Sequence, residues 1–433
     1  MSGLSRTNSP SASKCHVFRD GGEWLVFLAD QGLLFRTNGP AARMFRSNKY
    51  RTPAPDAASE PDAWAPTVAT VSPTNLCGQA CIYCYGTPAH QATEVIDLGF
   101  CERGLELIAA NAARRRAPMR VFFHGVGEPT ARWSRFTQCV SVTEQSAARH
   151  HVGLRMTLCT GGQLSESQAA YVADHFAVVE VSMDGPSDVQ NAQRPRRDGK
   201  DSFVPAMRTA AKAAAAYKEV SVRVTVTDRT VARMPEFVEF VAEELGPVGV
   251  KFGQMFPLPW VDAGVCAPPD AKRFIRYFAL ALDAGLRHGV NVGHPDVSIE
   301  WLAAEHQDSD VHYCLTATNR LAAFYDVPQE GSAPPKLGTY GWHDPTSQTL
   351  VIDQERRREI AAAPLDQACV TCVCRPACMG PGGVKGRMPR SVSPGGNDCR
   401  GRIGALQELL RRKCPARPVV VQAKGESRDG RAH

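Results

Sequence analysis

Long apolar runs are missing from this 433-residue sequence. No stretch of eighteen consecutive apolar residues occurs, which argues against a membrane-spanning helix and predicts no membrane partner. The first residues, Met1–Ser13, contain serine and threonine but no apolar stretch. We therefore expect no secretory signal peptide at this end of the chain.

An excess of one charge is also scarce over most of the chain. The formal net charge is +6, and residues 411–433 alone contribute seven basic against two acidic side chains. The remainder is close to neutral, so it does not predict the basic surface that nucleic-acid binding requires. We expect residues 411–433 to form a basic, poorly ordered tail, and we expect no nucleic-acid partner.

Cysteine, in contrast, is abundant, with fifteen residues in the chain. Many of these cysteines lie in two groups, one within residues 77–84 and the other within residues 369–399. Tight grouping in a long chain is typical of metal ligands rather than of a disulfide framework. Free thiols of this kind persist in a reducing compartment, so we expect a cytoplasmic protein.

The first group is the run Cys77-Gly-Gln-Ala-Cys81-Ile-Tyr-Cys84. Three thiolates within one short loop can hold a metal centre, and they leave it one protein ligand short of four. Iron–sulfur clusters normally take four protein ligands, so the loop predicts a cluster with one iron open to a small molecule. A structural zinc loop is the alternative interpretation. In a chain this rich in cysteine the spacing arises by chance roughly 0.02 times.

Strand-like and helix-like segments alternate from residue 68 onward, which is the pattern of a parallel α/β sheet with crossover helices. Six strands fall short of the eight in a closed barrel, so we expect an open, partial (β/α)6 TIM-like barrel. The cysteine loop follows the first strand and should lie at the carboxyl edge of the sheet, where α/β sites form. We expect strands at 68–72, 120–123, 154–158, 178–182, 220–226 and 248–254, and helices at 100–115, 136–149, 165–175, 203–217 and 234–244.

Two short apolar runs, 24–28 and 33–35, flank a turn before this region and predict a β-hairpin, followed by a short helix at 40–45. The Pro-, Ala- and Asp-rich stretch 52–66 is typical of a linker. Such a hairpin can bind a peptide by adding it as a strand. Packing of the hairpin on the barrel is the alternative.

The spacing Cys-x-x-x-Cys-x-x-Cys, with the aromatic Tyr83 before the third cysteine, resembles the signature of the radical S-adenosylmethionine (radical SAM) enzymes. The resemblance implies a four-iron cluster on Cys77, Cys81 and Cys84, whose open iron binds S-adenosylmethionine (SAM). In that family an electron from the cluster cleaves SAM to a 5′-deoxyadenosyl radical, which takes a hydrogen atom from the substrate.

The turns after the next two strands also resemble motifs of that family. His124-Gly-Val-Gly-Glu-Pro-Thr130 is similar to its Gly-Gly-Glu-Pro turn, which implies that Gly127 and Glu128 hold the amino group of SAM. An ordinary βα turn is the alternative. Thr160, in the segment Thr157–Gly162, is similar in position to the family's Thr-Asn-Gly turn and is a candidate contact for the cofactor.

The following strands supply two further candidates by resemblance. Ser182-Met-Asp-Gly-Pro186 is similar to a segment of peptide-modifying and sulfatase-maturing members, continued by Arg194-(x)4-Gly199-(x)2-Ser202-Phe203, and implies that Ser182 contacts the ribose. Arg223 would bind the methionine carboxylate, and a salt bridge at the strand edge is the alternative. Asp184 and Asp188 are the candidates for proton removal, although Asp184 can instead shape its turn.

The second cysteine group has the spacing of an auxiliary four-iron cluster in the SPASM extension of radical SAM enzymes, with a zinc ribbon as the alternative. Its four members are Cys369, Cys372, Cys378 and Cys399. The full SPASM pattern carries a further cysteine where this chain has Gly382, and it also carries a Gly-(x)4-Cys segment that is missing before Cys369. Only Cys314 remains as a candidate ligand of an inner cluster. We expect one auxiliary cluster and leave a second one open.

The resemblance implies a radical SAM peptide maturase that acts on a ribosomally made precursor peptide. A side-chain cross-link, carbon–carbon or thioether, is the first choice of product. An anaerobic sulfatase-type maturase that makes formylglycine, and a non-catalytic zinc-binding module, are the alternatives. A flavodoxin- or ferredoxin-type protein is the expected electron donor.

The expected organisation has five parts along the chain. They are an N-terminal hairpin region at 1–51, a linker at 52–66, the radical SAM partial barrel at 67–300, a Cys-rich SPASM/twitch-like auxiliary-cluster domain at 301–410, and the tail at 411–433.

Overall fold

The computed structural model describes residues 15–28, 33–46, 64–86, 93–255, 257, 260–297, 312–323, 338–344, 346–362, 369, 372–374 and 396–414. The chain divides into two compact units. The larger unit is Glu60–Leu406, and the smaller unit joins Met1–Ser59 to Gln407–His433.

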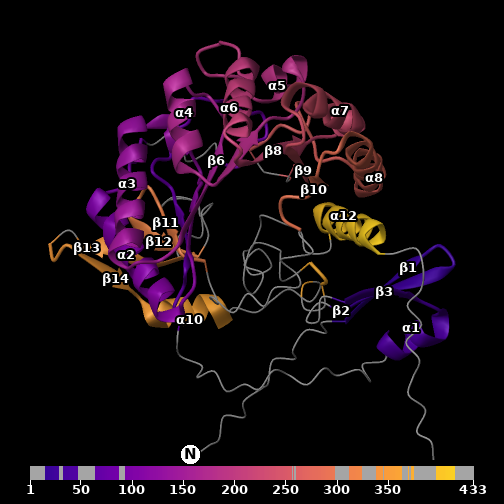
Figure 1. Ribbon diagram of the computed structural model, residues 1–433, viewed down its shortest axis with the longest axis horizontal. Coiled ribbons are helices and arrows are strands. Elements are labelled where there is room, and N and C mark those ends of the chain that lie inside the picture. The colour runs from indigo at the N-terminus through magenta and orange to yellow at the C-terminus, as the bar shows by residue number, and fades with distance from the viewer. Residues whose placement is uncertain are drawn as a thin grey trace, which may run out of the picture. The chain divides into compact units, whose positions relative to one another are not determined.

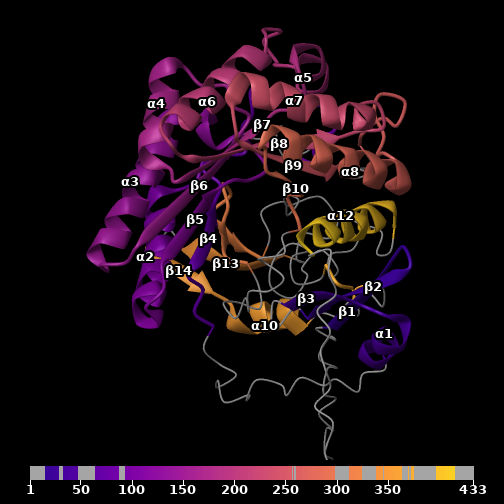
Figure 2. The ribbon, with the colours of Figure 1, turned by 45° about the vertical axis from the view of Figure 1, so that its right-hand side comes forward.

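The larger unit is built on a sheet of eleven strands within the described residues, in the order β10-β9-β8-β7-β6-β5-β4-β11-β12-β13-β14 (Figures 1 and 2). Its middle consists of the six parallel strands that the sequence predicts. They are β4 (Val68–Val71), β5 (Met119–Phe123), β6 (Leu154–Thr160), β7 (Val178–Ser182), β8 (Glu219–Val226) and β9 (Gly249–Gln254).

Both ends of the sheet extend beyond this prediction. The short strand β10 (Val292–Gly293) adds in parallel to β9, and β11 (Cys314–Leu315) adds in parallel to β4. The antiparallel strands β12 (Arg320–Ala322), β13 (Thr339–Asp344) and β14 (Thr349–Ile352) then follow. In the described part of the chain, the end strands β10 and β14 do not pair with each other, so the sheet described is open. The expectation of a partial barrel is confirmed.

Helices cover the outer side of this curved sheet (Figure 1). The five predicted crossover helices are present as α2 (Leu98–Arg115), α3 (Trp133–Arg149), α4 (Glu166–His175), α6 (Phe203–Ala215) and α7 (Met234–Leu245). The sequence analysis missed the short α5 (Ser187–Gln193), α8 (Ala271–His288) and α10 (Gln354–Ala362). The short 3-10 turns η3 (Pro129–Ala131) and η4 (Val231–Arg233) precede α3 and α7.

Local sequence explains how these elements begin and pack. Ser165 starts α4 with a capping box, because its hydroxyl accepts from the Gln168 amide and the Gln168 side chain accepts from the Ser165 amide. Between sheet and helices, the ring of Phe123 lies 5.6 Å from that of Phe136 and 5.4 Å from that of Phe176, in edge-to-face geometry. All three rings are fully buried, so they fix these helices against β5.

The smaller unit contains an antiparallel sheet of β1 (Cys15–Asp20), β2 (Glu23–Leu28) and β3 (Leu33–Thr37), followed by α1 (Gly39–Arg46). The pairing of β2 with β3 confirms the predicted hairpin, and α1 confirms the predicted helix. The sequence analysis missed β1, which mixes polar with apolar residues and contains no fully buried one, so its apolar pattern is weak.

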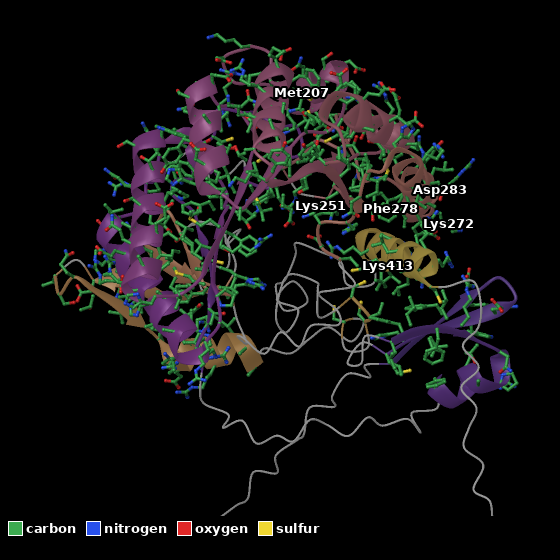
Figure 3. The ribbon with its side chains drawn as sticks, in the orientation of Figure 1. Met207, Lys251, Lys272, Phe278, Asp283 and Lys413 are labelled. Atoms are coloured by element: carbon green, nitrogen blue, oxygen red, sulfur yellow. The ribbon has the colours of Figure 1, made fainter. Side chains whose placement is uncertain are left out.

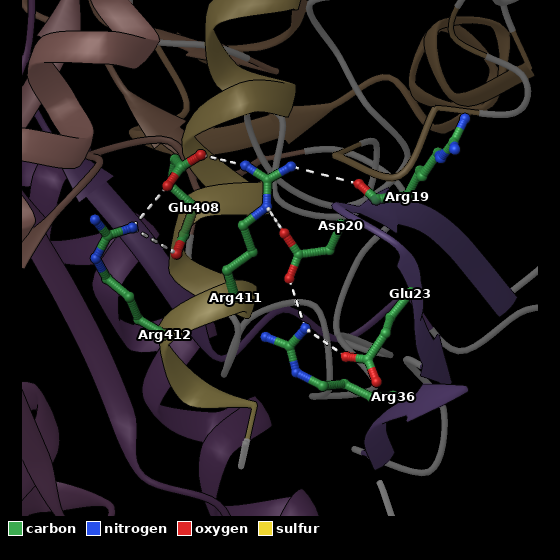
Figure 4. Close-up of polar contacts among 7 residues, drawn as sticks. All are labelled: Arg19, Asp20, Glu23, Arg36, Glu408, Arg411 and Arg412. Atoms are coloured by element: carbon green, nitrogen blue, oxygen red, sulfur yellow. Dashed lines mark hydrogen bonds and ion pairs between the residues drawn. The ribbon is translucent and has the colours of Figure 1, made fainter. Parts of the chain in front are cut away.

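The last turns of α12 (Asn397–Lys413) also belong to the smaller unit, from Gln407 onward. Asp20 joins sheet and helix, since its carboxylate lies 2.6 Å from Arg36 Nη1 and 3.0 Å from Arg411 Nε (Figure 4). Arg412 Nη1 lies 2.6 Å from the carboxylate of Glu408. Residues 411–413, where the sequence analysis expects the tail to begin, are the last residues of this helix.

Candidate functional site

The cysteine loop, residues 77–84, begins six residues after β4 ends, at the carboxyl edge of the parallel strands, as the sequence predicts. Cys77, Cys81 and Cys84 are all partly buried and free of disulfides. The Cys84 amide donates to the Cys81 carbonyl at 3.1 Å, which closes a turn between the last two thiols. The loop thus presents its three thiols from one compact segment.

A second segment, residues 193–197, runs antiparallel to the cysteine loop and holds it in place. It follows α5 directly, and neither the helix nor this pairing follows from periodicity in the sequence. An antiparallel bridge between Gln79 and Arg196 lies at its centre. Three backbone hydrogen bonds join the segments: Ala80 N to Pro195 O (2.7 Å), Ile82 N to Gln193 O (3.0 Å) and Arg197 N to Gly78 O (2.9 Å).

We call this second segment, residues 193–197, the clasp. Tyr83 connects the clasp to the end of β7. Its hydroxyl donates to Oδ2 of Asp184 and accepts a 2.8 Å hydrogen bond from Arg194 Nη1. Asp184 also accepts from Gln193 Nε2 at 3.0 Å and from the Thr225 amide at 2.9 Å. Burial raises the pKa of Asp184, against the lowering effect of the Arg194 cation. Both of its oxygens are engaged, which favours the turn-shaping interpretation over proton removal.

Asp188, the other candidate for proton removal, lies at the start of α5. Its side chain is 65% exposed and forms an ion pair with Arg233, at 2.6 Å. The hydrogen bond from Arg233 lowers the pKa of Asp188. The structure therefore gives Asp188 an exposed, paired position rather than a buried one.

The turn after β5 packs closely on the start of the cysteine loop. A Cβ atom added at Gly127 would lie 2.5 Å from the Thr74 carbonyl oxygen, so only glycine fits there. Glu128 is buried and accepts from Thr160 Oγ1 at 2.8 Å and from the Gly161 amide at 2.7 Å. The structure thus brings Gly127, Glu128 and Thr160 together at the carboxyl ends of β5 and β6.

Asn75, two residues before Cys77, was not identified from the sequence. The residue is 4% exposed, and among the described residues neither its amide nitrogen nor its amide oxygen has a hydrogen-bond partner. An unsatisfied buried polar group costs about 1–3 kcal/mol, so such a group is normally satisfied by something. The backbone of Asn75 lies against Gly127. A polar ligand between the loop and the Gly127 turn fits this unused amide.

Glu180 on β7, Arg223 on β8 and Lys251 on β9 form a charged layer. Figure 3 shows Lys251 on the inner side of the curved sheet. Glu180 accepts a hydrogen bond from Lys251 Nζ, and its Oε2 lies 3.9 Å from Arg223 Nη1. Burial opposes the charged form of Glu180, but Lys251 and Arg223 prevail and lower its pKa to about 2. Strand pairing aligns Ser182, Arg223 and Lys251 across three strands. The Arg223 side chain is 29% exposed, so its guanidinium is accessible to a further anion.

His124 lies directly after β5, and its pKa is lowered. Burial, together with the nearby Arg223 cation, lowers the pKa of His124 to about 3, and Glu180 opposes this only weakly. The imidazole is therefore neutral at physiological pH.

The Cys77 and Cys81 thiols are protonated in the unligated chain, because burial raises the pKa of Cys77 to about 11 and that of Cys81 to about 12. Metal binding supplies the free energy that deprotonates such ligands. Among the described residues, no three His, Cys, Asp or Glu side chains converge on a point that one metal ion could occupy.

The structure describes three of the four cysteines of the second group. Cys369, Cys372 and Cys399 are partly buried, and the Cys372 amide donates to the Cys369 carbonyl at 3.3 Å. Cys378 lies outside the described residues. Cys314 is buried in β11, opposite Thr70 of β4. The number of auxiliary clusters therefore stays a prediction.

Residues 71–241 match the sequence profile of the Radical SAM superfamily. Two curated relatives are each named "Mycofactocin maturase MftC". The one from Mycolicibacterium smegmatis is 27% identical over 182 residues, which cover 41% of this chain and 42% of that protein. The one from Mycobacterium tuberculosis H37Rv is 28% identical over 177 residues, which cover 40% and 41%. The chain thus matches less than half the length of these relatives.

A solved structure described as "Native anSMEcpe with bound AdoMet and Cp18Cys peptide" resembles this fold, with a TM-score of 0.58. The match covers 80% of this chain and 97% of that one at 16% identity, which supports a shared fold alone. Within the described part of the chain, no helix is long and apolar enough to cross a membrane.

Proposed function

We propose that this chain, which contains a radical SAM domain and is an enzyme, modifies a ribosomally made peptide at an unactivated carbon. The cysteine loop at the carboxyl edge of β4, followed by candidate cofactor contacts at the ends of β5, β6, β7 and β8, carries the proposal. The likeness to two proteins named mycofactocin maturase supports a maturase activity. The shared fold with a structure that holds AdoMet and a peptide supports a peptide substrate.

The bound cluster and SAM would supply an electron and a carbon radical that takes a hydrogen atom from the substrate. The residues of this chain hold and orient these groups. Cys77, Cys81 and Cys84 would ligate three irons, and the clasp at residues 193–197 fixes the loop that carries them. Gly127 allows the loop to approach the β5 turn, where the backbone and Glu128 would receive the amino group of SAM.

Two strands further on, Ser182 would contact the ribose, and Arg223 would bind the carboxylate of SAM. Glu180 forms ion pairs with both Arg223 and Lys251, which restrain the Arg223 guanidinium while part of that side chain stays exposed. The hydroxyl groups of Thr160 and Tyr83 already form hydrogen bonds with carboxylates. These two residues would therefore act on the cofactor mainly by positioning the backbone of their own turns. The Asn75 amide, which has no hydrogen-bond partner in the part of the chain that the structure describes, adds a donor and an acceptor beside these groups.

A cross-link between two side chains, carbon–carbon or thioether, is the product that we favour. Its formation removes two hydrogen atoms from the peptide, one to the 5′-deoxyadenosyl radical and one as a proton and an electron. The electron requires an acceptor, and an auxiliary cluster on Cys369, Cys372, Cys378 and Cys399 within residues 301–410 would provide it. An inner cluster involving Cys314 is not required. Formylglycine formation would use the same first step on a different substrate.

The electron that starts the reaction would come from a flavodoxin- or ferredoxin-type protein. Such a reaction needs a reducing compartment, and we place the enzyme in the cytoplasm. The N-terminal sheet of β1, β2 and β3 would provide an edge for the peptide to join as a further strand.

The test is anaerobic reconstitution followed by incubation with reductant, SAM and the short peptides encoded beside this gene. We expect 5′-deoxyadenosine to be released, and one peptide to lose two hydrogens in mass. Loss of two hydrogens from a single Ser residue, or the same oxidation of a Cys residue with release of its sulfur as H2S and gain of a water oxygen, would yield an aldehyde and indicate the formylglycine product. Stoichiometric zinc and no 5′-deoxyadenosine would instead support the zinc-binding module.

A further inference from the structure

The outer side of the cysteine loop reaches the surface of the protein. Gly78 and Ala80 are both exposed, although Gln79 between them is buried. A Cβ atom added at Gly78 would meet no atom within 4 Å. A cluster on this loop would therefore lie directly beneath an open face rather than deep in the sheet.

One flank of this face is basic. Residues 196–201 contain Arg196, Arg197 and Lys200 against Asp198 and Asp201, and Asp201 accepts hydrogen bonds from the Asn191 side chain and the Val204 amide. Asp198 is engaged by Arg196, whose Nε donates to it at 2.9 Å. Lys200, with a side chain that is 75% exposed, reaches Asp198 only at 3.9 Å. Arg197 is exposed as well, and its Nε donates to the Cys77 carbonyl at 3.1 Å. Positive charge is thus attached directly to the loop.

The other flank is apolar and aromatic. Trp260 is 44% exposed, and its Nε1 donates a 3.0 Å hydrogen bond to the carbonyl of Cys84. Val265, five residues on, is 42% exposed. Arg229 contributes an exposed cation here, because its Nη2 donates to the Gly264 carbonyl at 2.8 Å. The single acid of this stretch, Asp262, accepts from the Gly264 amide at 2.8 Å.

We infer that this face, formed by Gly78, Ala80, Arg197, Lys200, Arg229, Trp260 and Val265, is the docking surface for an acidic protein that carries one electron. The inference rests on the proposed function and names the partner of its reductive step. The carrier loses one electron and the cluster on the loop gains it, so no further reactant is needed.

Three features of the face match such a partner. The basic side chains complement an acidic surface and speed encounter. An exposed aromatic with neighbouring aliphatic side chains is the usual centre of a protein–protein contact. Trp260 is hydrogen-bonded to a cluster ligand's own carbonyl, so a protein bound over it would hold its redox group close to the cluster. A small reductant needs none of these features.

The test compares two reductants on the reconstituted holoenzyme. Reduced flavodoxin, an acidic one-electron carrier, and dithionite are each mixed with the enzyme, and bleaching of the cluster absorbance and 5′-deoxyadenosine release are followed. The variants are Lys200→Glu and Val265→Glu, one on each flank. Arg115→Glu is the matched control, because Arg115 ends α2 at the opposite, amino edge of β5.

We expect each flank variant to raise the flavodoxin concentration for half-maximal bleaching by about fivefold or more at low salt. The dithionite rate should stay within about twofold of wild type, and the control should match wild type with both reductants. Unchanged flavodoxin dependence and unchanged salt dependence in both flank variants would overturn the docking surface. A wild-type enzyme that bleaches with both reductants but releases no 5′-deoxyadenosine would count against the proposed function alone.

Discussion

Arg194 Nη1 donates a 2.8 Å hydrogen bond to the Tyr83 hydroxyl, which links the clasp to the cysteine loop from within the protein. The same hydroxyl donates to Asp184, so one phenol joins three segments that are far apart in sequence. The position of the loop relative to β7 depends on this contact.

Tyr83→Phe should therefore lower the free energy of unfolding of the unligated chain by about 1–3 kcal/mol, because Arg194 and Asp184 lose a buried partner. Urea unfolding followed by circular dichroism measures this. Tyr217→Phe is the control, since Tyr217 is 99% exposed and should show no change. Equal stability of the two variants would mean that the phenol does not hold the loop.

Arg223 can bind the carboxylate of SAM or serve only as a salt-bridge partner of Glu180. In the first case Arg223→Gln should weaken SAM binding by about tenfold or more, because a charge-assisted hydrogen bond is lost. Lys251→Gln, which removes the other partner of Glu180, should change SAM affinity far less. Equilibrium dialysis of SAM against the anaerobic holoenzyme measures both. Equal losses in the two variants would favour the salt-bridge role.

Two conservative substitutions distinguish the roles of Asp184 and Asp188, the two carboxylates proposed for proton removal. Asp184→Asn should reduce 5′-deoxyadenosine release even without peptide, because it disturbs the turn that Tyr83 and Thr225 hold. Asp188→Asn should leave both this release and peptide conversion within about twofold of wild type, since an exposed ion pair contributes little. Normal cofactor cleavage with blocked peptide conversion in Asp184→Asn would restore Asp184 as the general base.

His124 makes stability depend on pH. Its pKa is about 3 in the folded chain and near its ordinary value of about 6.5 when unfolded, so below that value the unfolded chain binds the proton first. Stability should fall with decreasing pH, by up to about 1.4 kcal/mol per unit. Glu180 has its pKa lowered from 4.5 to about 2 in the folded chain, so its contribution to stability is lost only as the pH falls below about 4.5.

Urea unfolding of the unligated chain at pH 7 and pH 5.5 isolates this contribution. His124→Gln should show a smaller loss of stability between these conditions than wild type. His288→Gln, at an exposed position at the end of α8, should keep the wild-type difference. An unchanged difference in His124→Gln would show that His124 is not buried as described.

The sequence predicts the parallel strands and their helices because alternating buried segments and caps such as Ser165 leave a local pattern. It also predicts the cysteine loop, whose ligands are adjacent in the chain. It does not predict the clasp, because the pairing of residues 193–197 with the loop uses backbone groups and leaves no periodicity. Glu180 and Lys251 were missed for a related reason: each is the single charged residue of its strand, and only the strand register brings them to Arg223.

The central claim is that Cys77, Cys81 and Cys84 hold an iron–sulfur cluster with one iron open to SAM. Electron paramagnetic resonance of the dithionite-reduced holoenzyme, recorded with and without SAM, tests it most directly, with Cys81→Ala as the comparison. We predict a reduced-cluster signal in wild type that changes when SAM is added, and the loss of that SAM-sensitive signal in Cys81→Ala. A wild-type spectrum that ignores SAM, or a Cys81→Ala spectrum that still responds to it, would contradict the claim.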